Sequence, residues 1–137
     1  MELVMLGTGS PLPDPNRAGP SQLVGVDGRW FLVDAGRGCL MRLVAAGLGL
    51  VAIEQLLVTH LHSDHCGGNA ALQKAWPSVL TAIPPGQADH VRQWDAYALS
   101  YTPTGQECPP FRADTLLVPG SCVLLGDKPW QLHSPHF

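Results

Sequence analysis

Long apolar runs are absent from this sequence, and no stretch approaches the roughly 20 residues that cross a membrane as a helix. Charged residues are few, at 14% of the chain, and the formal net charge is −3. The chain therefore lacks the overall basic charge that draws a protein to nucleic acid, although a local basic patch stays compatible with these numbers. Internal repeats and low-complexity tracts are also absent. These absences argue against a membrane-spanning protein, a repeat protein and a globally basic nucleic-acid binder.

Paired cysteine motifs are missing too. The four cysteines, Cys39, Cys66, Cys108 and Cys122, form no C-x-x-C pair, and no secretory signal is visible. We therefore expect a reduced thiol state and a cytoplasmic protein. Cys66 directly follows His65, so it is either a packed free thiol, which we favour, or a metal ligand or reactive thiol.

The size and composition indicate a globular chain. At 137 residues with 45% hydrophobic residues, we expect one domain, residues 1–137, with a buried core. The 15 glycines and 13 prolines indicate many turns and loops.

Three histidines and one aspartate occupy six positions directly after an apolar run at 53–58. In an extended segment, His60 and His62 point the same way, Asp64 continues that alternation, and His65 swings to the other side as the chain turns. This spacing predicts one metal against His60 and His62 and a second against Asp64 and His65. Imidazoles and a carboxylate suit zinc and similar ions. The plain alternative is a histidine-rich loop without a metal.

Hydrophobic periodicity predicts an α/β fold around this motif. Asp27-Gly28 joins two β-rich runs and suits a two-residue type I′ turn. The order of strand, helix and strand places the motif at the carboxyl end of a sheet strand, where open sheets flanked by helices hold their ligands. Strands are expected at 2–6, 21–26, 29–34, 51–58, 79–83, 115–118 and 122–125, and helices at 38–48, 69–76 and 87–101.

Two other strand ends carry notable residues. Asp34 ends a nearly all-apolar strand, so its carboxylate needs partners. It either forms a turn or helix cap, or holds a ligand histidine or the backbone of the motif loop. Gly7 and Gly9 end the first strand, but no third glycine or helix follows, which argues against a nucleotide-binding loop. They form either a strand-end turn or a loop that borders the metal site. His90 is interpreted as a surface histidine.

The pattern H-x-H-x-D-H at 60–65 is the signature of the metallo-β-lactamase superfamily, and this sequence resembles it at every defined position. The segments 6–11, 17–21, 32–36 and 57–65 resemble the opening of ribonuclease Z and related zinc phosphodiesterases, over residues 1 to about 100. The resemblance implies a four-layer αββα sandwich of two similar halves with the metals in the cleft between them. This chain supplies about the amino-terminal half of such an α/β fold.

The resemblance also implies the ligands of two zinc ions. One ion would be held by two motif histidines and a later histidine, and the other by the motif aspartate and third histidine. His133 is the best candidate for the later ligand, and His136 is the alternative. The implied set is His60, His62, Asp64, His65 and His133.

Two further family ligands, a bridging aspartate and a final histidine, have no match in this chain. Asp114 and Asp127 precede His133, so their order is wrong. The domain is therefore expected to be incomplete at its carboxyl end. A half sandwich leaves an apolar face uncovered, which favours a homodimer.

The resemblance implies metal-assisted hydrolysis of a phosphodiester, in which zinc lowers the pKa of a water and Asp64 takes a proton from it. The substrate would be precursor transfer RNA, cut at its 3′ side, or a small sulfate or cyclic nucleotide ester. The RNA-gripping insertion of the nuclease is not recognisable. The competing interpretation is a truncated, catalytically silent metal-binding fragment. An RNA-binding module without catalysis is less supported, because the eight basic residues are scattered.

Overall fold

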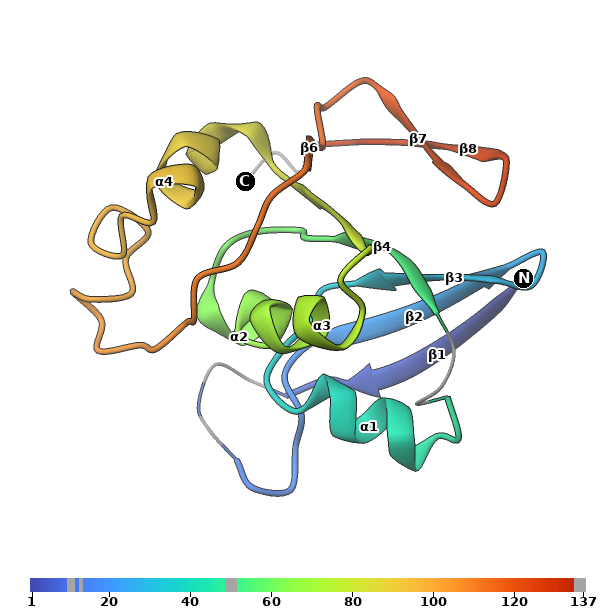
Figure 1. Ribbon diagram of the computed structural model, residues 1–137, viewed down its shortest axis with the longest axis horizontal. Helices are drawn as coiled ribbons and strands as arrows, with labels where there is room; N and C mark the ends of the chain where they lie inside the picture. Colours follow the sequence, from blue (N-terminus) through green and yellow to red (C-terminus); the bar gives the residue numbers. More distant parts are fainter. Residues whose placement is uncertain (10–11, 13, 49–51, 135–137) are drawn as a thin grey trace.

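A mixed six-stranded sheet forms the centre of the computed structural model, which describes residues 1–9, 12, 14–48 and 52–134. Its strands lie in the order β1-β2-β3-β4-β5-β6 (Figure 1). The strands are β1 (Glu2–Gly7), β2 (Ser21–Val26), β3 (Arg29–Val33), β4 (Ile53–Leu57), β5 (Leu80–Ile83) and β6 (Thr115–Leu116).

The strand pairing in the sheet changes from antiparallel to parallel at β3. Strands β1, β2 and β3 pair antiparallel, whereas β3, β4, β5 and β6 pair parallel. The turn between β2 and β3 has positive φ at both central residues, 51° at Asp27 and 75° at Gly28, as a type I′ turn requires. The predicted hairpin is therefore confirmed. The parallel arrangement brings the carboxyl ends of β3 and β4 to the same edge of the sheet.

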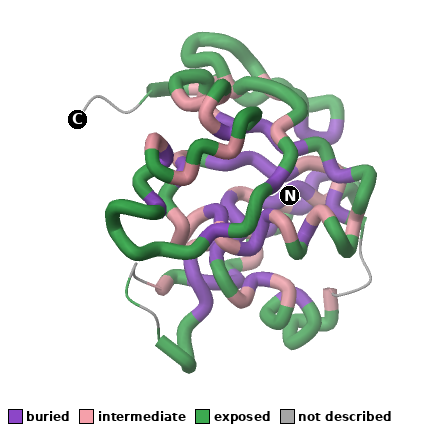
Figure 2. Tube along the Cα trace, turned by 60° about the vertical axis from the view of Figure 1, so that its left-hand side comes forward, coloured by how far each residue is buried: buried purple, intermediate pink, exposed green. Residues whose placement is uncertain are grey.

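Helices cover one face of this sheet. They are α1 (Cys39–Ala45), α2 (Ser63–Cys66), α3 (Asn69–Ala75) and α4 (Ala88–Gln93), with a 3₁₀ turn η1 (Pro85–Gln87) before α4. Leu43 of α1 and Leu72 of α3 are fully buried in the same cluster as Leu23, Leu32 and Leu56 of the sheet. Figure 2 shows this buried interior enclosed by exposed outer turns.

The opposite face is covered in part by a separate hairpin, β7 (Cys122–Leu125) and β8 (Lys128–Gln131). Leu125 packs there with Phe31 in a second, smaller cluster. On the same face, Leu3 pairs with Val24, which in turn pairs with Phe31. Leu3 and Met5 are 64% and 54% exposed. The face away from the helices thus keeps apolar side chains in contact with solvent, as expected for half of a two-sheet sandwich.

The helix predicted at 87–101 is much shorter than its periodicity indicated. α4 ends at Gln93 because Trp94 adopts a left-handed conformation with φ 52°. The Asp95 carboxylate then accepts a hydrogen bond from the Ala98 amide, which stabilises a turn. The apolar residues that suggested one helical face instead pack from successive turns, with Tyr101 buried against the core.

The segment after His62 was also predicted incorrectly. His62 is extended, with φ −65° and ψ 144°, but residues 63–66 form one turn of helix rather than continuing as a strand. The amide of Cys66 donates to the His62 carbonyl, and that of Gly67 donates to the Ser63 carbonyl. Asp64 and His65 are therefore placed by a helical turn rather than by strand alternation.

Several other boundaries differ in detail. The predicted start of a strand at Val51 lies outside the described residues, and the strand is observed from Ile53. β6 ends at Leu116 rather than at 118, and β8 forms where no strand was predicted. None of the helices within the described ranges has the length and apolar character needed to cross a membrane.

Candidate metal centre

The motif lies where β3 and β4 end side by side. Asp34 follows β3 and Thr59 follows β4 by two residues, and the Asp34 amide donates to the Leu57 carbonyl at 2.9 Å. The helical turn of the motif is joined to the end of β3 as well, because the Ala35 amide donates to the His65 carbonyl at 2.9 Å. The histidines and Asp64 therefore sit at the carboxyl edge of parallel strands.

The Asp34 carboxylate holds the motif in place. Its Oδ1 accepts the Thr59 amide at 2.8 Å, and its Oδ2 accepts the Thr59 hydroxyl at 2.7 Å and lies 2.7 Å from His65 Nδ1. Asp34 is only 2% exposed and adopts a φ of 58°. Of the two roles predicted for Asp34, the contacts match the second, because it holds both a ligand-type histidine and the motif backbone.

These contacts set the proton positions on His65. An ionised carboxylate accepts hydrogen bonds but does not donate them, so Nδ1 of His65 carries a proton and donates the hydrogen bond to Asp34. In the neutral ring, Nε2 is then the nitrogen with the free lone pair, and it lies 3.5 Å from Oδ2 of Asp64. A carboxylate–histidine pair of this kind presents the free nitrogen to a metal and raises its basicity.

The Thr59 hydroxyl determines which nitrogen of His60 donates a hydrogen bond. Its single proton is donated to Asp34, so the oxygen can only accept from Nδ1 of His60, which lies 3.1 Å away. That arrangement leaves Nε2 of His60 free as a ligand atom. Asp34 therefore orients one ligand-type histidine directly and a second through Thr59.

The structure brings the motif side chains together. Ligand atoms of His60, His62 and Asp64 all lie within 4.8 Å of one another. The His60 ring centroid is 4.7 Å from that of His62 and 3.9 Å from that of His65. Asp64 therefore groups with the first two histidines, and His65 is not a member of that group. The assignment of Asp64 and His65 to a separate ion stays a prediction.

This donor set fits a zinc ion. Burial lowers the pKa of His60, and the neighbouring rings of His65 and His62 lower it further, so the imidazole is neutral at neutral pH. Neutral imidazole and ionised carboxylate are the forms that bind zinc. The two free Nε2 atoms and the adjacent carboxylate give the cluster the chemistry of a metal centre rather than of a histidine-rich surface loop.

The helical turn Ser63–Cys66 packs closely against the backbone at Gly19 and Gly36. A Cβ atom built on Gly36 would lie 2.5 Å from the Asp64 carbonyl oxygen, and one on Gly19 would lie 2.6 Å from it. The Gly9 amide donates to the Ala18 carbonyl at 2.9 Å, so the G-x-G loop packs on the segment that supports Asp64. The two roles predicted for that loop, a strand-end turn and a border of the metal site, stay predictions.

Other sequence-predicted residues lie apart from the cluster. His133 is exposed after β8, and within the described residues it does not join the group of His60, His62 and Asp64. His136 lies outside the described residues. Cys66 is buried in the core, where its thiol lies 3.1 Å from the Tyr101 hydroxyl, in agreement with a packed free thiol. Asp114 accepts the Thr81 amide and an Arg112 N–H.

Sequence reasoning missed the role of Thr59. A hydroxyl directly before the first motif histidine, at the end of a buried strand, was the available signal. The glycines at 19 and 36 were missed as supports, because their partner, the Asp64 backbone, is distant in sequence.

Thr59→Val is expected to weaken zinc binding about 10-fold while leaving the fold intact. The change removes the hydroxyl at nearly constant volume and keeps the hydrogen bond that the backbone N–H of residue 59 donates to Asp34. Thr59→Ser should restore the affinity, since it restores the hydroxyl. Competition with a chromophoric chelator measures both. Equal affinities for the valine variant and the unmodified chain would show that His60 does not depend on Thr59.

A metal-binding α/β half-sandwich is the class of protein that this fold and cluster define. The family model described as the metallo-beta-lactamase superfamily matches residues 15–137. The chain belongs to this superfamily.

The relatives narrow the branch. The chain is 54% identical over 86 residues to a protein named ribonuclease Z from Mycobacterium avium, a match that covers 61% of this chain and 30% of that protein. It is 60% identical over 87 residues to the ribonuclease Z of Mycolicibacterium gilvum, covering 62% of this chain and 30% of the relative. The chain thus corresponds to the amino-terminal part of these relatives, about a third of their length.

Solved structures share the fold. A metallo-β-lactamase from Legionella gormanii superposes with a TM-score of 0.70 at 15% identity, over 90% of this chain and 46% of that one. A metallo-β-lactamase fold protein from Bacillus subtilis gives a TM-score of 0.67 at 16% identity, over 90% of this chain and 48% of that one. These two likenesses establish the fold alone, as the αββα class of which the chain supplies a part.

Proposed function

We propose that this chain is the amino-terminal, metal-binding part of a zinc-dependent phosphodiesterase of the ribonuclease Z type. The observation that carries the proposal is the Asp34 carboxylate, which binds His65 directly and His60 through Thr59, next to the cluster of ligand atoms of His60, His62 and Asp64. The curated relatives named ribonuclease Z support the choice of this branch.

The residues proposed to hold zinc are His60, His62, Asp64 and His65, with His133 as a further ligand of the first ion. When bound, zinc supplies Lewis-acid stabilisation of phosphate charge and lowers the pKa of water. Asp64 is proposed as the catalytic residue that accepts a proton from the attacking water. Asp34 and Thr59 bind Nδ1 of His65 and of His60, which leaves the Nε2 atoms as the available ligand atoms.

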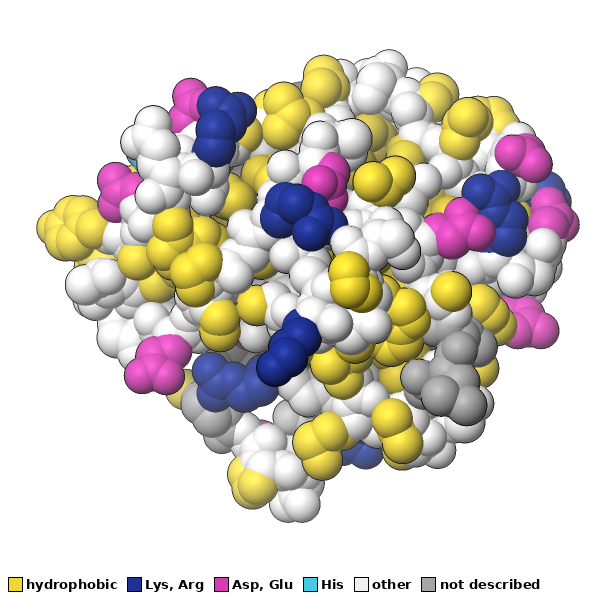
Figure 3. Space-filling view, viewed as in Figure 1, with side chains coloured by type: hydrophobic (Ala, Val, Ile, Leu, Met, Phe, Trp, Pro, Cys, Tyr) yellow, Lys and Arg dark blue, Asp and Glu magenta, His cyan; other side chains and the backbone are white. Residues whose placement is uncertain are grey.

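Precursor transfer RNA is the proposed substrate, by analogy with the name of the relatives, and a small phosphodiester or sulfate ester is the related alternative. On the face drawn in Figure 3, Lys and Arg side chains lie at several separate places among apolar and acidic groups. This dispersal gives no support to RNA binding as a function on its own. We further propose a cytoplasmic location, and a homodimer formed through the face that exposes Leu3 and Met5.

A catalytically silent metal-binding fragment is the second candidate. It is favoured by the position of His133, which is exposed and apart from the cluster. With His133 apart, two histidines and Asp64 would remain to hold a first ion, and the proposed second ion would also need Asp64.

His62→Ala is expected to lower zinc affinity by roughly 100-fold and to abolish hydrolysis of bis-p-nitrophenyl phosphate, because a ligand is lost. His90→Ala, a histidine on α4 outside the cluster, is the matched control and should change neither quantity. Metal analysis of the purified chain accompanies the assay. Bound zinc without turnover would select the silent fragment, and zinc at background level would contradict both candidates.

A further inference from the structure

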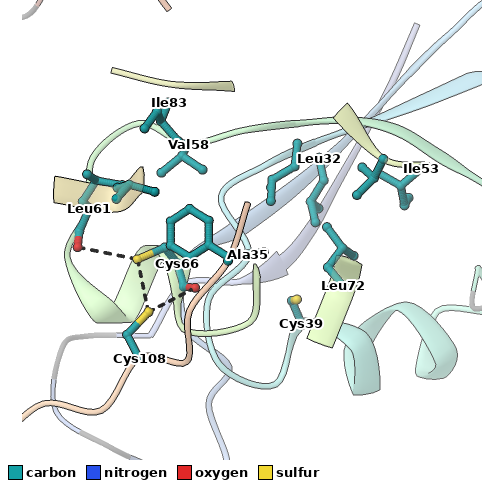
Figure 4. Packing of buried hydrophobic residues seen from close by; sticks show 14 of the residues in the cluster. Leu32, Ala35, Cys39, Ile53, Val58, Leu61, Cys66, Leu72, Ile83 and Cys108 are labelled. Carbon is teal, nitrogen blue, oxygen red and sulfur yellow. Dashed lines mark hydrogen bonds between the residues drawn. The ribbon is translucent and has the colours of Figure 1, made fainter. Parts of the chain in front are cut away.

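Two buried thiols face each other at the end of the helical turn Ser63–Cys66, which carries Asp64 and His65 and is called the metal turn below. Cys66 Sγ lies 3.7 Å from Cys108 Sγ, although the two residues are 42 positions apart (Figure 4). Cys66 is the last residue of α2, and Cys108 lies in the segment that connects the turns after α4 to β6. The pair therefore joins the motif to a part of the chain that is distant in sequence.

The surroundings hold both sulfurs in this arrangement. Cys66 Sγ lies 3.2 Å from the His62 carbonyl and 3.1 Å from the Tyr101 hydroxyl, which itself donates to the Leu61 carbonyl at 2.6 Å. The Cys108 thiol points back at the Cys66 carbonyl at 3.6 Å. These contacts hold the backbone on both sides in place. From their separation of 3.7 Å, the sulfurs need to approach by less than 2 Å to reach a bonding distance of about 2.05 Å.

The two thiols differ in access. Cys66 is fully buried, whereas Cys108 is 9% exposed and follows an exposed loop at 102–107. A hydrogen bond from the Cys66 thiol lowers the pKa of Cys108, which favours its thiolate. A small oxidant therefore meets Cys108 first, and Cys66 stands behind it as the nearest thiol.

We propose that Cys66 and Cys108 form a redox pair that a hydroperoxide converts to a disulfide, which ties the metal turn to residues 106–111. The peroxide oxidises the Cys108 thiol to a sulfenic acid and leaves as an alcohol, or as water when it is hydrogen peroxide. The Cys66 sulfur then attacks the Cys108 sulfur, the S–S bond forms, the S–O bond breaks, and water leaves. One peroxide is consumed for each disulfide, and a dithiol reductant reverses the change.

The test treats the purified, reduced Cys122→Ser chain with stoichiometric hydrogen peroxide, because Cys122 is exposed and would link chains to one another. Thiols counted after unfolding are expected to fall from three to one per chain. Mass spectrometry should find Cys66 joined to Cys108, with Cys39 still a thiol. Cys39 is buried on α1, apart from the contact between Cys66 and Cys108, which makes it the internal control. The oxidised chain should unfold at a Tm higher by roughly 10 °C, because the link closes a long loop.

Cys108→Ala and Cys39→Ala in the same background are the matched variants. The Cys108→Ala chain keeps Cys39 and Cys66 and should form no disulfide within the chain. The Cys39→Ala chain should still form the disulfide between Cys66 and Cys108. A linked product that contains Cys39, or oxidation of Cys108 to sulfinic acid without any link to Cys66, would overturn the proposal. Because the peptide mapping is done on the Cys122→Ser chain, the outcome does not depend on whether the alanine variants fold.

Discussion

Replacing Asp34 by alanine is expected to weaken zinc binding by roughly 10- to 100-fold and to destabilise the metal-free fold by about 3 kcal/mol. The change leaves three donors without their acceptor, namely the Thr59 amide, the Thr59 hydroxyl and Nδ1 of His65. It also places alanine at a φ of 58°, which aspartate and asparagine tolerate better. Chelator competition measures the first effect, and urea unfolding in the presence of chelator measures the second.

Two variants separate these causes. Asp34→Asn keeps the tolerance of positive φ and one acceptor oxygen, so it should retain more stability than Asp34→Ala but lose comparable zinc affinity, because an amide cannot accept at both positions. Asp114→Ala removes a carboxylate that accepts a strand amide, that of Thr81, away from the motif. It should lower stability without a specific loss of zinc. Unchanged zinc affinity in both Asp34 variants would remove the carboxylate from the account of the site.

Gly36→Ala is expected to destabilise the fold by about 3 kcal/mol and to lower zinc affinity at the same time. The added Cβ would lie 2.5 Å from the Asp64 carbonyl oxygen and 2.5 Å from the Gly19 carbonyl carbon, and both of these are backbone atoms that cannot turn aside. The helical turn that carries Asp64 and His65 must therefore move away from β3. Thermal unfolding and zinc titration, compared on the same samples, measure the two effects.

Gly86→Ala provides the matched control, since a Cβ there meets no atom within 4 Å. It should leave both stability and zinc affinity unchanged. If Gly36→Ala behaved like Gly86→Ala, the close packing of the turn against β3 would have no energetic weight, and Asp64 would be positioned by the motif alone.

Much of the sheet was predictable because its signals are local. The Asp-Gly turn between β2 and β3 requires positive φ, and few residue pairs accept it so readily. The helix at 69–75 shows its apolar spacing and ends before Pro77. The clustering of His60, His62 and Asp64 also followed from spacing, since positions on one short segment cannot lie far apart.

The rest depended on contacts that spacing does not contain. The helix predicted at 87–101 satisfied the amphipathic pattern, but the left-handed Trp94 and the Asp95 turn redirected the same apolar residues into the core. The helical turn at Ser63–Cys66 is too short for periodicity to detect. The role of Asp34 was an open alternative, because its partners lie 25 and 31 positions away and only the parallel pairing of β3 and β4 brings them together.

That pairing has a consequence for the order in which the chain assembles. Asp34, Thr59 and the four histidine and aspartate side chains of the motif all belong to the unit formed by β3, α1, β4 and the turn that follows. Contacts of low sequence separation close at a smaller entropic cost, and the amino-terminal part of a chain is synthesised first. The contacts that position the motif side chains therefore all lie within residues that are synthesised before β6 and the β7–β8 hairpin.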